Sequence, residues 1–149
     1  MNNIDVVIVG NIAYDINTFP RRDKDTDKVV INRGGEGYYS LIPASLYTKT
    51  GIVARVGNDF NTKFHHTYLT DDGQTKTFKP EIYEETLISI EDFPKEYYEA
   101  KYIHIATNFP SKQKEFIDVI RKHSKAIISI DTHEAYMEKK VPFIKWNIR

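Results

Sequence analysis

The sequence predicts an α/β fold, in which a mostly parallel core sheet is flanked by helices and a small antiparallel β layer lies beside it. Extended apolar runs of the kind that parallel sheets bury recur along the chain, at residues 6–9, 52–56, 102–106 and 126–130. Two segments between and beside these runs have helical spacing, near 40–50 and 111–123. A hairpin signal at Asp71-Asp72-Gly73 indicates the additional β layer.

Composition limits the possibilities for the whole chain. Its 149 residues suffice for one domain with a sizeable core and are too few for two ordinary ones. The chain has 21 Lys and Arg residues and 21 Asp and Glu residues, so it carries no net positive charge that would favour binding to nucleic acid. Cysteine is absent, which excludes disulfides, thiolate metal sites and a cysteine nucleophile. No basic start followed by an apolar run, and no apolar run of membrane-spanning length, is visible, so we expect a cytoplasmic protein without a membrane partner.

The first core strand, predicted over about residues 5–10, brings polar side chains to its carboxyl end. Asn11, Tyr14 and Asp15 follow Gly10 closely. In open α/β sheets, ligands bind at the carboxyl ends of the strands. A dinucleotide fingerprint needs glycines spaced as GxGxxG, and this turn has only one. Taken by itself, Asp15 could simply cap a local turn.

Adjacent glycines at Gly34 and Gly35 follow the extended run at residues 29–31 and precede an amphipathic segment. Such a pair is placed where no side chain fits or where φ must be positive. A strand that turns into a helix here would let a ligand approach the backbone amides at the start of the helix. A tight turn without a ligand is the alternative.

The helix after the glycine pair contains Pro43, which would break a helix interior. We therefore predict that the helix begins near Ser40, with the proline in its first turn, and that Gly51 supplies the C′ cap. A second core strand is predicted over about residues 52–57.

The hairpin predicted at about residues 63–70 and 74–79 cannot be the next parallel strand, because only residues 60–62 separate it from Asp59. It therefore belongs to the small β layer, together with residues 29–31. His65 and His66 point to opposite faces of a strand, so they cannot bind one metal together, and we predict no metal site.

The last part of the chain predicts a strand at about residues 102–106, a helix over 111–123 with Ser111 as N-cap, and a strand at about 126–131. His104 is interpreted as a packed strand residue. Asn108 lies in the loop that leaves the third core strand.

The order of these features resembles the N-terminal half of the PfkB/ribokinase family of carbohydrate and nucleoside kinases. The likeness rests on residues 6–15, on Gly34-Gly35 opening a helix, on Val56-Gly-Asn-Asp59, and on Asp131 after a late strand. It implies a Rossmann-like core with a small antiparallel β-sheet lid, the ribokinase-like fold. Residues 1–149 would then form a single partial domain, with lid segments at about 16–33 and 62–90 inserted in the core.

The resemblance also implies a substrate site. Asp15 matches the carboxylate that binds substrate hydroxyls, and Gly34 and Gly35 match the hinge between lid and core. Tyr39 stands where the family usually has an asparagine, and its ring could stack on a sugar or a nucleobase. Asn11 and Asn108, each in a loop after a core strand, complete the expected substrate-binding set.

By the same resemblance, the expected activity is ATP-dependent phosphotransfer to a hydroxyl of a small sugar or nucleoside, with this chain carrying the substrate-and-lid half. ATP and Mg²⁺ are expected for a complete family member. The family's second signature, a glycine-rich turn with the catalytic aspartate, is missing, because the glycines do not follow Asp131-Thr132. No catalytic or ATP-binding residue is therefore identified in this chain.

The alternative is a non-catalytic, truncated relative that acts as a sugar- or nucleoside-binding module or as a dimerisation module. The family likeness further implies a homodimer through the lid, near residues 29–32 and 63–79, because a small sheet with free edges tends to pair.

Overall fold

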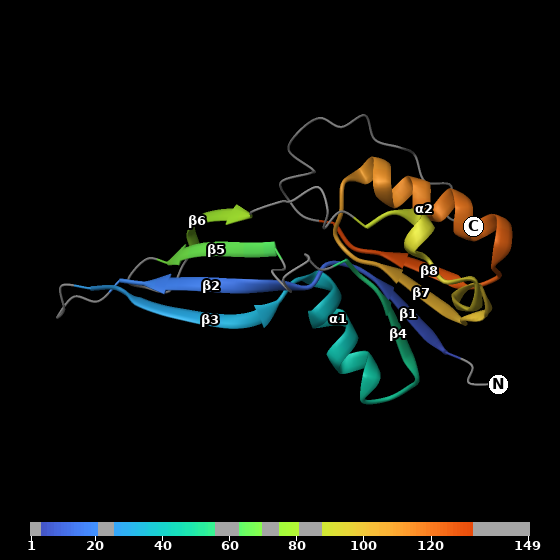
Figure 1. The fold of residues 1–149 in the computed structure, drawn as a ribbon, viewed down its shortest axis with the longest axis horizontal. Coiled ribbons are helices and arrows are strands. Elements are labelled where there is room, and N and C mark those ends of the chain that lie inside the picture. The colour runs from blue at the N-terminus through green and yellow to red at the C-terminus, as the bar shows by residue number, and fades with distance from the viewer. Residues whose placement is uncertain (1–3, 21–25, 56–62, 70–74, 81–87, 133–149) are drawn as a thin grey trace.

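The computed structural model describes residues 4–20, 26–55, 63–69, 75–80 and 88–132, with the segments 63–69 and 75–80 described by their backbone. The strands form two four-stranded sheets, one in a compact core and one that extends from it to one side (Figure 1). None of the helices in these ranges is long and apolar enough to cross a membrane.

The core sheet has the order β4-β1-β7-β8, and all its neighbouring strands run parallel. Its strands are β1 (Val6–Val9), β4 (Thr50–Val53), β7 (Tyr102–Ile105) and β8 (Ile127–Ile130). The four predicted core strands are thus confirmed, and β1 lies inside the sheet rather than at an edge. β4 begins two residues before the predicted start.

The hydrophobic core lies between this sheet and helix α2 (Pro110–His123). Val7 and Ile103 on the sheet and Phe116 and Ile120 on the helix are almost completely inaccessible to solvent. Burying each such side chain contributes about 1.5–3 kcal/mol. Two short 3-10 turns, η2 (Ile90–Asp92) and η3 (Lys95–Glu99), pack Ile90 and Tyr97 against this core, and Phe93 between the turns is buried in it.

Helix α2 begins one residue before the predicted start. Pro110 occupies its first position, and Phe109 rather than Ser111 is the N-cap residue. Proline suits this position because its missing N–H would have no partner inside the helix. The basic residues Arg121 to His123 form the last turn, where positive charge interacts favourably with the negative end of the helix dipole.

Helix α1 (Glu36–Ser45) corrects the prediction more strongly, because it starts directly after Gly35 instead of near Ser40. Pro43 therefore lies near its carboxyl end and not in its first turn. The helix ends two residues later, so the missing proline N–H costs only one hydrogen bond near a terminus. Gly51 is not a helix cap either; it lies in β4 and pairs with Val7.

The second sheet has the order β3-β2-β5-β6. Its strands are β2 (Ala13–Phe19), β3 (Lys28–Gly34), β5 (Lys63–Leu69) and β6 (Thr75–Pro80). β2 pairs with β3 and β5 pairs with β6 in antiparallel register, as predicted for a small β layer, while β2 and β5 run parallel. The predicted turn at Asp71–Gly73 lies outside the described residues.

Candidate functional site

The two sheets are joined where the chain leaves β1. After Gly10 the chain passes through Asn11 and enters β2, and it returns through β3 into α1 (Figure 1). The amide of Gly37 in the first turn of α1 donates a 2.9 Å hydrogen bond to the Asn11 carbonyl. The start of α1 is therefore fastened to the segment that links the core to the second sheet.

Gly35 forms the turn between β3 and α1 with a φ of 90°. A Cβ at this residue would lie 2.6 Å from the Asn11 carbonyl oxygen and 2.9 Å from the Ala13 nitrogen. Both reasons for placing a glycine here therefore hold: the backbone has positive φ, and other backbone atoms approach closely.

Gly34 is a glycine for a different reason. A Cβ there would lie 2.0 Å from Asp15 Oδ2 and 2.7 Å from Oδ1, so the carboxylate occupies the space that a side chain would need. Gly34 pairs with Ala13, and Asp15 pairs with Asn32, which puts the carboxylate and Gly34 on the same face of the second sheet.

Asp15 lies in β2, so the alternative that it caps a local turn is wrong. The hydroxyl of Tyr39 in α1 donates a 2.6 Å hydrogen bond to Asp15 Oδ2. This bond is the main reason that the pKa of Tyr39 is raised to about 12, since the carboxylate favours the protonated phenol, and partial burial adds to the effect. The phenol is therefore protonated at neutral pH and joins the core helix to the second sheet.

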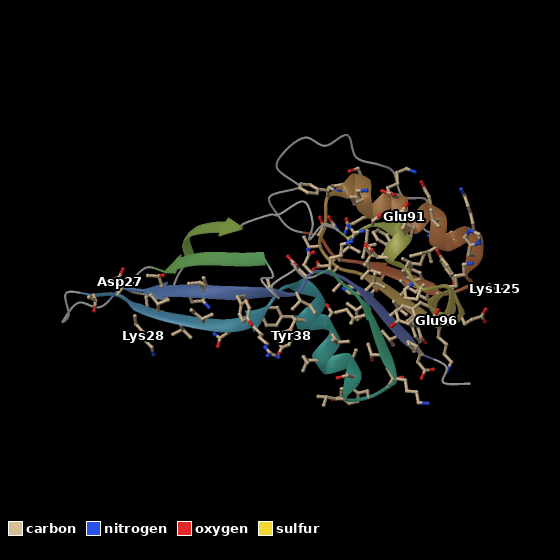
Figure 2. All side chains as sticks on the ribbon, viewed as in Figure 1. Asp27, Lys28, Tyr38, Glu91, Glu96 and Lys125 are labelled. Carbon is tan, nitrogen blue, oxygen red and sulfur yellow. The ribbon has the colours of Figure 1, made fainter. Side chains whose placement is uncertain are left out.

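The Tyr39 side chain is nevertheless 57% exposed. Its ring contacts the edge of the Tyr38 ring, with centroids 6.0 Å apart. Figure 2 shows Tyr38 where β3 meets α1, whereas Asp27 and Lys28 lie at the opposite end of the second sheet. The cluster of Asp15, Gly34 and Tyr39 thus comes from three elements, β2, β3 and α1, and its Tyr39 is exposed to solvent.

Sequence reasoning missed Gly37. A Cβ on Gly37 would lie 2.6 Å from the carbonyl carbon and oxygen of Gly10, and one on Gly10 would lie 2.8 Å from the Gly37 Cα. The two glycines therefore allow α1 to pack directly against the end of β1. The signal was present as a third glycine two residues after the pair at Gly34 and Gly35.

The two predicted asparagines differ in their placement. Asn11 is buried in the link between β1 and β2, and its carbonyl is the group that approaches Gly35 and Gly37. Asn108 lies in the loop after β7, where its Oδ1 accepts a 2.7 Å hydrogen bond from the Phe109 amide. β1 and β7 are parallel neighbours, so both loops leave the same edge of the core sheet.

A further polar group that sequence reasoning missed holds this edge together. Gln113 is buried in α2, and its Nε2 donates to the carbonyls of Ala106, at 3.2 Å, and Asp131, at 2.6 Å. The Thr107 hydroxyl donates to Asp131 Oδ2 at 3.0 Å. The sequence did contain a signal for this role, because Gln113 is a polar residue one turn before Phe116 on the otherwise apolar face of the helix.

His104 is half-buried in β7, and its Nδ1 lies 2.9 Å from Ser129 Oγ on β8, which agrees with its interpretation as a packed residue. Burial lowers the pKa of His104. Within the described ranges, no three His, Asp or Glu side chains form a group that could hold a metal ion. The side chains of His65 and His66 lie outside those ranges.

Comparison with known proteins gives matches at the level of structure. No protein-family model and no curated protein matches the sequence. A ribokinase from Giardia lamblia superposes with a TM-score of 0.71 at 14% identity, covering 89% of this chain and 52% of that structure. A fructokinase with bound ATP from Xylella fastidiosa gives 0.67 at 16% identity, covering 87% and 52%. The Halothermothrix orenii fructokinase gives 0.66 at 13% identity, covering 86% and 57%.

The chain therefore has the ribokinase-like fold of the PfkB sugar kinases, a parallel core sheet with helices and a small β-sheet lid, as the sequence resemblance implied. It spans about half the length of the solved structures that it matches. From here on, the second sheet is called the lid.

Proposed function

We propose that this chain is the substrate-and-lid half of a PfkB-type kinase, which transfers a phosphoryl group from ATP to a hydroxyl of a small sugar or nucleoside. The observation that carries the proposal is the convergence of Asp15 from the lid with Gly34, Gly35 and Tyr39 at the hinge, on a fold shared with ribokinases and fructokinases.

The chemistry of the cluster suits a polyhydroxylated ligand. A carboxylate accepts strong, charge-assisted hydrogen bonds from hydroxyl groups. Because Gly34 has no side chain, the Asp15 carboxylate lies close against the backbone of the lid. Phosphoryl transfer depends mainly on positioning and charge stabilisation, so binding and orienting the acceptor hydroxyl is the role we assign to these residues.

ATP as donor is supported by two structural neighbours, the fructokinase with bound ATP and a Cryptococcus neoformans ribokinase in complex with ADP. Mg²⁺ would accompany the nucleotide. Among the described residues, no three His, Asp or Glu side chains form a group that could hold a metal ion. We assign no residue of the chain a role toward ATP or Mg²⁺. No residue of the chain is assigned as the catalytic base.

A homodimer through the lid is part of the proposal. Val29 and Ile31 on β3 are 55% and 61% exposed. The register places them with Ile16 on the face of the sheet opposite Asp15. An exposed apolar strip on an edge strand favours pairing with a second copy, and pairing on that face leaves the Asp15 face available to the ligand.

A non-catalytic sugar- or nucleoside-binding module is the second candidate. It is favoured by the sequence after Asp131-Thr132, which lacks the glycine-rich turn that precedes the catalytic aspartate in the family. Both candidates use the same ligand site, and they differ in whether ATP is consumed.

The test is calorimetric titration of ribose, fructose and adenosine into the wild-type chain and into Asp15→Ala. Losing a hydrogen bond to a charged group costs about 1.5–3 kcal/mol, so affinity for the bound ligand should fall by about 10- to 150-fold. Asp27→Ala removes a carboxylate at the far end of the lid (Figure 2) and should leave affinity unchanged.

Equal affinity in the wild type and in Asp15→Ala would overturn the site. Failure of the wild type to bind any of the three compounds would count against both candidate functions. Where binding occurs, ADP release in the presence of ATP, Mg²⁺ and the bound compound separates the kinase from the binding module.

A further inference from the structure

The hydroxyl of Tyr39 has one hydrogen, which it donates in a hydrogen bond to the Asp15 carboxylate. The donor oxygen on α1 and the acceptor Oδ2 on β2 are 2.6 Å apart, at the short end of the range for hydrogen bonds between hydroxyls and oxygen acceptors. The raised pKa of Tyr39 shows that this proton is held more firmly than in a free phenol. The side chain is therefore fixed in one orientation beside the carboxylate.

This arrangement determines what the pair can offer a ligand. An ionised carboxylate only accepts hydrogen bonds, and a phenol whose hydrogen is already donated can only accept further ones. Asp15 and Tyr39 together therefore present acceptors and no donor. An asparagine in place of Tyr39 would offer two N–H donors beside its carbonyl acceptor.

We propose that Tyr39 is a specificity-determining residue, which makes the site select ligands carrying two adjacent hydroxyl groups. One hydroxyl would donate to the Asp15 carboxylate and the other to the Tyr39 oxygen. The short distance between the two acceptor oxygens lets neighbouring hydroxyls of one sugar ring reach both. The inference rests on the proposed function, because it requires Asp15 to bind substrate hydroxyls.

Two other roles for Tyr39 predict different behaviour. If Tyr39 were only a latch that a ligand hydroxyl displaces from Asp15, removing its hydroxyl would tighten binding. If its exposed ring only stacked on the ligand, phenylalanine would replace it without loss, since both rings have the same face. The variant Tyr39→Phe therefore distinguishes all three roles.

The experiment is calorimetric titration of the full chain and of Tyr39→Phe with adenosine and a methyl ribofuranoside, each beside its 2-deoxy counterpart, which lacks the adjacent pair of ring hydroxyls. A hydrogen bond between neutral groups contributes about 0.5–1.5 kcal/mol, so Tyr39→Phe should weaken binding of the diol by about 2- to 12-fold. Affinity for the deoxy compound should change by less than about twofold, because that compound does not use the Tyr39 oxygen.

An unchanged ratio of diol to deoxy affinity in Tyr39→Phe, or tighter binding of the diol, would overturn the inference while leaving the Asp15 site intact. If the wild type binds none of the compounds, the proposed function fails and the inference fails with it. The two failures are thus distinguishable.

A second measurement needs no ligand. In a chain labelled at the tyrosine Cζ, NMR titration should show the Tyr39 signal, assigned by its absence from Tyr39→Phe, remaining in the protonated position through about pH 10, where exposed tyrosines ionise. In Asp15→Asn, which removes the charge of the acceptor, Tyr39 should ionise at a lower pH than in the wild type. Ionisation of wild-type Tyr39 at the same pH as in Asp15→Asn would show that the pair does not form, and would overturn the inference alone.

Discussion

Replacing Gly37 with alanine tests the packing of α1 on the end of β1, because two physical effects oppose each other at this residue. Alanine is favoured over glycine by about 0.8–1.0 kcal/mol in a helix interior and by less in the first turn, where Gly37 lies, so local propensity predicts that Gly37→Ala stabilises the protein. The tertiary structure predicts the reverse. The added Cβ would lie 2.6 Å from the Gly10 carbonyl carbon and oxygen and 2.8 Å from the Asn11 carbonyl oxygen.

The magnitude follows from these distances. Carbon atoms in contact prefer a separation of about 3.5–4.0 Å, so α1 and the end of β1 would have to separate by roughly 1 Å. Overpacking of this kind costs about 1–3 kcal/mol, and the cost lies toward the upper end because the opposing atoms are backbone and cannot rotate away. After subtracting the gain in propensity, the net loss is about 1–2 kcal/mol.

Urea denaturation of the full chain, followed by far-UV circular dichroism, measures this loss. With a slope of about 2 kcal/mol per molar urea, the midpoint should fall by roughly 0.5–1 M at unchanged slope. Ser40→Ala in the same helix is the control, and it should raise stability by up to about 0.5 kcal/mol through propensity alone. If Gly37→Ala were as stable as the wild type or more so, the close packing of α1 on β1 would be refuted.

Two further predictions concern the lid and the core. Ile31→Lys places a charge on the apolar strip of β3, so in sedimentation velocity it should convert the proposed homodimer to a monomer. Lys28→Ala, on the other face of that strand, should leave the dimer intact. A wild type that is monomeric at micromolar concentration would contradict the proposed dimer. Burial lowers the pKa of His104 in the folded state. The contribution of the neutral imidazole to the free energy of unfolding is therefore complete above the unfolded pKa near 6.5. It is lost as the pH falls below that value, because the unfolded state then binds a proton more readily than the folded state. His104→Gln should accordingly flatten the decline of the urea midpoint between about pH 7 and about pH 5, and an unaltered decline in His104→Gln would assign it to other groups.

The sequence by itself determined the parallel core and the place of the glycine turn between β3 and α1. Residues 6–9 and 102–105 form strands because their apolar side chains suit burial on a parallel sheet, and α2 forms because Phe116 and Ile120 fall on one helical face. These signals are local, so they can be read without knowing the partner. The glycine pair likewise predicted positive φ and close approach, and Gly35 has both.

Only the tertiary structure decided how the residues around the glycine turn meet. Helix α1 begins at Glu36 because Gly35 turns the chain and Gly37 docks on Gly10, contacts that outweigh the local preference that Pro43 indicates for a later start. β2 is a strand because it pairs with both β3 and the distant β5.

The hydrogen bond between Tyr39 and Asp15 joins residues 24 positions apart, one in helix α1 and the other in strand β2 of the lid. Its formation depends on where the lid lies relative to α1, which no local pattern contains. Residue types and strand periodicity are properties of neighbours along the chain, whereas close packing and the direction of a single hydroxyl are properties of neighbours in space.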